Sequence, residues 1–209
     1  MARHAKQALV QEDKAPTAGT NPKAPLKEPS ASVETSRGRK RFRMPESSHA
    51  GRYGLVFVLV ILTWIVLDRV SKIQFLGMQS GPTIAGPYLG IIDIRLVHNT
   101  GAAWGIFADS TFALGIFSVI VCAVLTIYFI ATIRQANALT TLGFGMVVAG
   151  GIGNAVDRFT YGHVTDFIEF SFMDFPVFNV ADIGVTVGFV FIIIGLLVMW
   201  RRSAARDRA

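Results

Sequence analysis

The sequence has little of what soluble domains, metal centres and nucleotide sites are built from. Charged residues make up 16% of its 209 positions and apolar residues 52%, too little charge for an ordinary soluble domain of this length. The single cysteine, Cys122, lies in an apolar stretch, which excludes an intrachain disulfide and a thiolate metal cluster. His98 and His163 lack the spacing of zinc ligands, and no phosphate-binding glycine loop is present. We therefore expect a membrane protein without metal or cofactor.

The basic residues lie mostly outside the apolar runs, in residues 1–52 and 201–209. This placement fits anchoring at the cytoplasmic face better than binding of nucleic acid, despite the net charge of +6. Residues 1–50 are rich in Ala, Pro, Lys and Ser and end in a basic cluster at 37–43, which predicts a disordered cytoplasmic tail. No apolar run of the kind found in a secretory signal peptide precedes residue 50, so we expect the first run to be a retained anchor.

Four apolar segments approach the length of about 20 residues that crosses the hydrocarbon core of a bilayer. They cover residues 52–71, 112–133, 138–156 and 181–200. The third is rich in glycine, and small residues at spacing four, such as Gly145 and Ala149, predict a helix that is buried among its neighbours. The fold class that we predict is an all-α membrane protein, a bundle of four transmembrane helices over residues 51–200 with a basic cytoplasmic tail at 201–209.

An even number of spans places both termini on one side of the membrane. Arg134, Arg201 and Arg202 indicate that this side is the cytoplasm, so the two long connections face outward. Residues 92–96 in the first connection and 163–172 in the second alternate between apolar and polar, which predicts a strand in each.

Acids at the outer edge of a membrane span are costly and therefore suggest function. Asp68, Asp157, Asp166 and Asp182 all lie toward this edge in the predicted topology. Asp182 also has a structural interpretation, since Asn179 can cap the fourth helix and Asp182 would then lie in its first turn. The two interpretations are compatible.

Asp166 stands on the apolar face of its predicted strand, where an acid is rare unless it is paired or protonated. Burial and a nearby second carboxylate would both raise its pKa. We hypothesise that Asp166 holds a proton while Asp182 is charged, so that one activates water and the other protonates a carbonyl oxygen. In that case the chain is an aspartic endopeptidase.

Other charged residues allow several interpretations. Ser71 and Lys72 do not form a Ser/Lys catalytic pair, because adjacent residues on a helix do not face each other, whereas Asp68 and Lys72 at spacing four form an ion pair. Arg158 either pairs with Asp157 or another acid or anchors the helix at the interface. The non-enzymatic alternatives are a membrane transporter subunit and a non-catalytic scaffold.

Five short motifs resemble those of lipoprotein signal peptidases (signal peptidase II) in order and spacing, over residues 52–200. They are Asp68-Arg-Val-Ser-Lys72, Asn99-Thr-Gly-Ala-Ala-Trp-Gly105, Gly153-Asn-Ala-Val-Asp-Arg158, Val164-Thr-Asp-Phe167 and Phe178-Asn-Val-Ala-Asp182. The resemblance implies that Asp166 and Asp182 are catalytic. It further implies that supporting or substrate-binding roles fall to Asp68, Lys72, Asn99, Gly101, Asn154, Arg158 and Asn179.

The resemblance also implies a small extracytoplasmic β-sheet cradle in the first outer loop. The implied substrate is a prolipoprotein whose lipobox cysteine carries diacylglycerol, cleaved just before that cysteine. The implied location is the bacterial inner membrane, in contact with its lipids, with the active site toward the outer face. One chain supplies both acids, so we expect a monomer.

Overall fold

The structure is a computed structural model, and it describes residues 48–101 and 110–206. The predicted tail over residues 1–50 lies almost entirely outside the described residues, and so does the part of the Asn99–Gly105 motif that follows Gly101.

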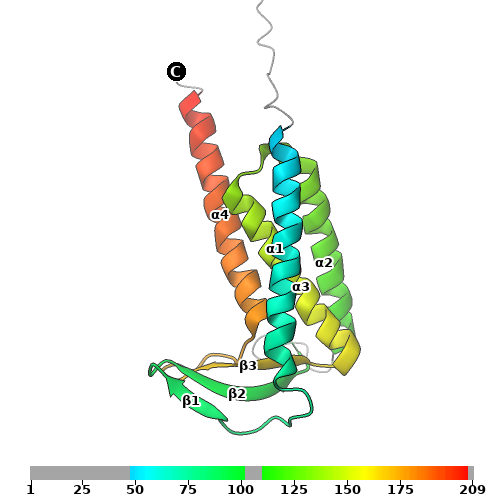
Figure 1. Ribbon diagram of the computed structural model, residues 1–209, viewed down its shortest axis with the longest axis vertical. Coiled ribbons are helices and arrows are strands. Elements are labelled where there is room, and N and C mark those ends of the chain that lie inside the picture. The colour runs from blue at the N-terminus through cyan, green and yellow to red at the C-terminus, as the bar shows by residue number, and fades with distance from the viewer. Residues whose placement is uncertain (1–47, 102–109, 207–209) are drawn as a thin grey trace, which may run out of the picture. The chain divides into compact units, whose positions relative to one another are not determined.

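Within the described residues, four helices are long and apolar enough to cross a membrane. They match the four predicted spans in order, and their bounds are α1 (Ser48–Ile73), α2 (Thr111–Thr132), α3 (Ala138–Tyr161) and α4 (Val180–Arg206). A short 3-10 helix, η2 (Ile133–Gln135), follows α2. Figure 1 shows α1 beginning and α4 ending at the end of the bundle opposite the sheet. Arg201 and Arg202, expected in a tail, belong to the last turns of α4.

The third helix is longer than its apolar run. Asn137 caps its start, because the Asn137 side chain accepts a hydrogen bond from the Thr140 main chain while the Thr140 hydroxyl accepts one from Asn137 N. Its C-cap is Gly162, with a φ of 73° that favours glycine. Asp157 therefore lies inside α3 and not after it as expected. The helix tolerates this charge because Asp157 is paired with cations of α1.

As the glycine content predicted, α3 is the buried helix of the bundle. In the most apolar stretch of α3, 67% of the residues are buried, whereas in the most apolar stretch of α1 only 6% are buried. A Cβ added at Gly145 would lie 2.8 Å from Val60 Cγ1 of α1, and one added at Gly143 would lie 2.8 Å from Ile192 Cγ1 of α4. Nearer the sheet end, a Cβ added at Gly153 would lie 2.7 Å from Asp68 Oδ2 of α1 and 3.4 Å from Ala181 Cβ of α4, so polar residues of the three helices lie within reach of one another there.

A three-stranded antiparallel sheet lies at one end of the bundle (Figure 1). Its strands, in spatial order, are β1 (Ala85–Tyr88), β2 (Ile92–Asn99) and β3 (Val164–Phe170). The two predicted strands are thus present and pair with each other, and β2 extends through Asn99. The sheet therefore joins both long connections, with Val97 opposite Asp166 in the register. This pairing brings Asp166 to the ends of the helices.

Candidate active site

Asp166 is a buried acid near the start of β3, with 2% of its surface exposed. Its Oδ2 accepts a hydrogen bond from Asn99 Nδ2 at 2.9 Å, and its Oδ1 accepts one from Asn179 Nδ2 at 2.6 Å. Asn99 comes from the neighbouring strand β2, and Asn179 lies immediately before α4. Sheet pairing and a helix start thus supply the two amides that hold this carboxylate.

Asp182 lies in the first turn of α4 and forms a capping box with Asn179. The Asn179 Oδ1 accepts from Asp182 N at 3.0 Å, and the Asp182 Oδ2 accepts from Asn179 N at 3.1 Å. The cap that the sequence indicated is therefore present. A carboxylate here also meets the positive end of the helix dipole, which favours its negative charge.

Asn154 of α3 completes a link between the two acids. Its Nδ2 donates to Asp182 Oδ1 at 2.7 Å, and its Oδ1 accepts from Asn179 Nδ2 at 3.1 Å. Because Asn179 Nδ2 also donates to Asp166, two amide side chains connect the two carboxylates. Neutral amides fix the orientation of both acids without neutralising the charge of either.

The environment of Asp166 alters its protonation. Burial, and then the negative charge of Asp182, raise the pKa of Asp166 to about 7, while hydrogen bonds from Asn99 and Asn179 and the charge of Lys72 oppose the rise. Near neutral pH this carboxyl can therefore hold a proton beside a second acid. Two such groups can share one proton and act as an acid and a base.

Both acids line a cavity of about 510 Å³. The remaining polar side chains at its wall include Asn99, Asn154 and Arg158. The apolar part of the wall comes from both ends of β3, the segment before α4 and the first turns of α4: Val164, Phe170, Phe175, Pro176, Val177, Phe178, Ile183 and Val187. A cavity with convergent polar groups on a largely apolar wall is the usual form of a binding site for a partly apolar molecule.

Arg158 faces this cavity and does not pair with Asp157. Its Nη2 donates to Gly101 O at 3.2 Å and its Nη1 to Asn154 O at 3.4 Å. Gly101 is itself held by Asn99, whose Oδ1 accepts from Gly101 N at 3.0 Å. The interpretation of Arg158 as the partner of Asp157 is therefore wrong, because other cations occupy that carboxylate.

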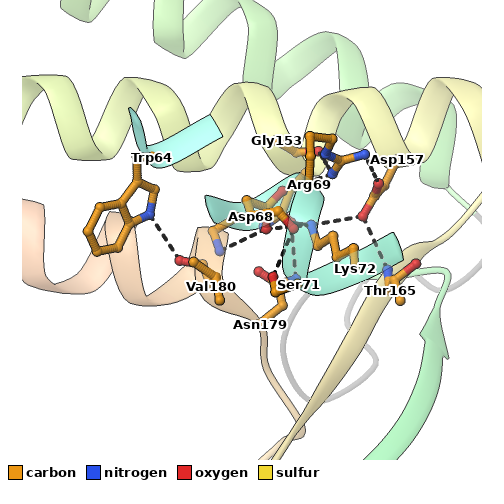
Figure 2. A network of polar contacts seen from close by, with 12 residues as sticks. Trp64, Asp68, Arg69, Ser71, Lys72, Gly153, Asp157, Thr165, Asn179 and Val180 are labelled. Atoms are coloured by element: carbon orange, nitrogen blue, oxygen red, sulfur yellow. Dashed lines mark hydrogen bonds and ion pairs between the residues drawn. The ribbon is translucent and has the colours of Figure 1, made fainter. Parts of the chain in front are cut away.

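Next to Asn154 lies a largely buried group of four charges, which we call the four-charge cluster: Asp68, Arg69, Lys72 and Asp157 (Figure 2). The predicted ion pair of Asp68 and Lys72 is present, with Nζ–Oδ1 at 3.0 Å. Lys72 Nζ also lies 2.8 Å from Asp157 Oδ2 and donates to Asn154 Oδ1 at 3.0 Å. The cluster thus contacts the amide that holds Asp182.

Sequence reasoning missed Arg69 and did not assign Asp157 to this cluster. Arg69 is adjacent to Asp68, and adjacent residues on a helix do not face each other, but its long side chain bends back to Asp68 at 2.8 Å and reaches Asp157 at 2.7 Å. The number of acids in the sequence indicates that a further cation is needed. Four acids lie at this membrane edge in the predicted topology, and the ion pair predicted for Lys72 accounts for only one of them.

No group of three or more His, Cys, Asp or Glu side chains is arranged to hold a metal ion in residues 48–101 and 110–206. His98 and His163, which the sequence places on separate connections, stack with their ring centroids 4.0 Å apart. That the protein works without metal or cofactor stays a prediction.

Comparison with known proteins agrees with this geometry. The profile of the family described as signal peptidase (SPase) II matches residues 60–198. The lipoprotein signal peptidase of Gloeobacter violaceus is 34% identical over 152 residues, which cover 73% of this chain and 87% of that protein. That of Caulobacter vibrioides is 36% identical over 143 residues, which cover 66% of this chain and 83% of that protein.

Two solved structures, both described as bacterial membrane enzymes obtained by the in meso method, share the fold. The one at 2.3 Å resolution is 31% identical, with a TM-score of 0.61 over 68% of this chain and 87% of that chain. The one at 1.9 Å resolution is 32% identical, with a TM-score of 0.59 over 68% of this chain and 92% of that chain. Together with the family profile and the curated relatives, these similarities show that the chain belongs to the signal peptidase II family of aspartic membrane peptidases.

Proposed function

We propose that Asp166 and Asp182 are the catalytic pair with which this signal peptidase II cleaves signal peptides from prolipoproteins. The observation that carries the assignment is their shared setting. Both carboxylates line one cavity, and neutral asparagine amides link them. Neither acid is in an ion pair within the part of the chain that the structure describes. Each therefore remains able to exchange a proton.

The proposed reaction uses the two acids in complementary states. Asp182, whose charge the start of α4 favours, takes a proton from a water molecule as the water oxygen attacks the scissile carbonyl carbon. Asp166 gives its proton to the carbonyl oxygen, and its raised pKa supports this role at neutral pH. When the C–N bond breaks, Asp182 gives its proton to the leaving amine and Asp166 takes a proton back from a hydroxyl of the tetrahedral intermediate, which restores both acids. The titration belongs to the pair as a unit.

We further propose that the substrate cysteine carries a diacylglyceryl group and that cleavage falls just before it. The apolar wall of the cavity supports a substrate with a lipid or apolar side chains beside the scissile bond, and includes Phe170, Phe178 and Ile183. Asn99, Asn154 and Arg158 line the same cavity, and side chains of these types can bind a peptide carbonyl. A lipid-bearing peptide at the membrane surface meets both requirements.

The multi-pass topology suggests an orientation for the site. The start of α1 and the end of α4 lie together, with Arg201 and Arg202 at that end, while the sheet and the cavity lie at the other. The positive-inside rule then favours cytoplasmic termini and an active site at the outer face of the bacterial inner membrane. Because one chain supplies every residue of the site, a monomer is sufficient. A transporter or scaffold role is not favoured by the family relationship.

The test is cleavage of a diacylglyceryl-modified prolipoprotein by the purified full-length protein in detergent, resolved on a gel. We expect Asp166→Asn and Asp182→Asn each to reduce kcat by about 10²- to 10⁴-fold, the loss typical for an acid-base group. Asp93→Asn is the matched control, because Asp93 lies on β2 outside the cavity wall.

Folded variants at 166 or 182 that cleave at the wild-type rate would contradict the catalytic assignment. The same prolipoprotein without its diacylglyceryl group tests the substrate proposal separately. We expect it to be cleaved at a much lower rate, and equal cleavage of both forms would contradict the requirement for the lipid.

A further inference from the structure

Each acid of the four-charge cluster holds the main chain directly before one of the proposed catalytic acids. Asp68 Oδ1 accepts a hydrogen bond from Ala181 N at 3.1 Å, and Ala181 precedes Asp182. Asp157 Oδ2 accepts one from Thr165 N at 3.3 Å, and Thr165 precedes Asp166. Figure 2 shows Asp157 between Arg69, Lys72 and the Thr165 main chain. The cluster thus contacts the main chain of α4 and of β3 directly before Asp182 and Asp166, where it can position both residues.

Two cations of α1, Arg69 and Lys72, each join Asp68 to Asp157. Arg69 Nη1 lies 2.7 Å from Asp157 Oδ1, and Arg69 Nη2 lies 2.8 Å from Asp68 Oδ2. Lys72 Nζ makes a second link between the same carboxylates, at 3.0 Å from Asp68 and 2.8 Å from Asp157. The result is a closed arrangement in which two negative and two positive side chains balance.

Arg69 also contacts the main chain of α3. Its Nη2 donates to Gly153 O of α3 at 3.0 Å while still contacting Asp68. The planar guanidinium presents several donors in a fixed geometry, whereas Lys presents one nitrogen on a flexible stem. Arg69 thus fixes α1, α3 and, through Asp68, α4 at once.

We propose that Arg69 is a positioning residue for the peptidase reaction: by locking Asp68 to Asp157, it fixes the main chain at Ala181 and Thr165 and so the spacing of Asp182 and Asp166. The inference rests on the proposed function, because it concerns the same catalytic pair. Asp166 and Asp182 come from separate elements, β3 and α4, so their spacing needs a support that joins both elements. A misplacement of about 1 Å can reduce a rate by about 10²-fold.

A role in geometry accounts for the cluster better than a role in stability. Buried ion pairs add little net stability, because removing the charges from water costs about as much as their attraction returns. Their directional contacts nevertheless define one arrangement of the groups that they join. The side chain of Arg69 is 26% exposed, against 4% for Lys72, so a substitution at Arg69 perturbs the fold less and is the better probe.

The experiment compares Arg69→Lys and Arg69→Gln with wild type in the full-length protein, using the diacylglyceryl-prolipoprotein assay across a range of pH. We expect kcat to fall by about 10-fold in Arg69→Lys and by about 10²-fold in Arg69→Gln, with KM within about 2-fold of wild type. The two pH limits of kcat should also shift, because the spacing of the pair sets how strongly its members interact. Arg69→Lys keeps the charge, so a shift there reports geometry.

The matched control is Arg95→Lys, in which an exposed Arg–Glu169 pair at 2.8 Å loses its guanidinium on β2, the strand that pairs with the one carrying Asp166. We expect its kcat, KM and pH limits to match wild type. Arg69 variants that lose thermal stability but keep the wild-type kcat and pH limits would overturn the inference. If Arg69→Gln does not fold, Arg69→Lys carries the test.

The same assay separates this inference from the proposed function. Inactive Asp166→Asn and Asp182→Asn variants beside a fully active Arg69→Lys would refute the positioning role and leave the catalytic pair intact. Active variants at 166 and 182 would refute the catalytic pair itself.

Discussion

Two pairs of acids lie at the sheet end of this bundle, and burial does not distinguish Asp166 from the acids of the four-charge cluster, although Asp182 is only partly buried. Asp68 and Asp157 of the four-charge cluster are 0% exposed, and Asp166 of the proposed catalytic pair is 2% exposed. Their partners differ. Each cluster acid meets two cations at 2.7 to 3.0 Å, whereas amides and main-chain N–H groups hold Asp166 and Asp182.

The difference shows that partner chemistry, more than burial, decides what a membrane-edge carboxylate can do. A carboxylate that is fully engaged by cations and main-chain donors has no free position for a substrate and contributes geometry. A carboxylate held by neutral amides next to a second acid can gain and lose a proton at accessible pH. This protein has carboxylates paired with cations and carboxylates held by neutral amides close together. The following substitutions test whether the two kinds have different roles.

The largest expected effect follows from removing a cation of the cluster. Lys72→Met leaves Asp68 and Asp157 with one cation between them in a buried site, and we expect a loss of about 3–5 kcal/mol in the free energy of unfolding. The measurement is unfolding of the purified protein in detergent by added denaturant. Arg201→Met, at an exposed arginine of α4, is the control and should be neutral. A Lys72→Met protein as stable as wild type would contradict the division.

A smaller effect is expected from crowding the cluster without changing its charge. A Cβ at Gly153 would lie 2.7 Å from Asp68 Oδ2 and 3.4 Å from Ala181 Cβ, so Gly153→Ala should lower the free energy of unfolding by about 1–3 kcal/mol. Gly51→Ala, in α1 with nothing within 4 Å of the added atom, should be neutral or stabilising by about 0.5–1 kcal/mol. Equal stabilities for the two variants in the same unfolding assay would rule out a tightly packed cluster.

Per unit of pH, the smallest effect concerns the proposed catalytic pair, and it has the opposite sign. Because burial and the charge of Asp182 raise the pKa of Asp166 to about 7, the folded state binds more protons than the unfolded state between about pH 4 and pH 7. Wild-type stability therefore falls as the pH rises through this window. The Asp166→Asn variant lacks this pH-dependent fall in stability. Its free energy of unfolding relative to wild type should therefore increase with pH, by at most about 1.4 kcal/mol per pH unit, and level off above about pH 7.

Thermal unfolding of both proteins in detergent from about pH 5 to about pH 8 measures this difference. Asp166→Asn also loses hydrogen-bond complementarity. This loss changes the free energy of unfolding by an amount that does not depend on pH, so it does not affect the slope of stability against pH. Asp93→Asn, on the sheet outside the cavity wall, is the control variant in the same assay. A difference between Asp166→Asn and wild type that does not change with pH would show that Asp166 titrates normally.

Much of the fold could be predicted from local features. The four apolar runs became four helices, the glycine-rich run became the buried helix, and both alternating segments became strands. The end of α3 could not be placed in the same way. Hydropathy stops at Asp157, but the helix continues to Tyr161 because cations of another helix pair with that charge.

The residues around the cavity were predicted less evenly. Asn179 and Asp182 form the cap that their spacing indicated, and Asp68 and Lys72 form the expected pair. Arg158 was assigned an acid as one possible partner, yet it donates to main-chain carbonyls, and Arg69 was overlooked. Such choices depend on which helix faces which, and spacing within one helix holds no information about this.

The sequence by itself determined the number of spans, the cap of α4 and the acids worth testing. Bilayer thickness and the need to satisfy main-chain hydrogen bonds act on each segment separately, so these features can be read locally. Only the tertiary structure decided that Asp157 meets Arg69 and Lys72 while Asp166 meets Asn99 and Asn179. The close packing of α3 against its neighbours and the pairing of β2 with β3 bring those groups together, and both are contacts between segments far apart in the chain.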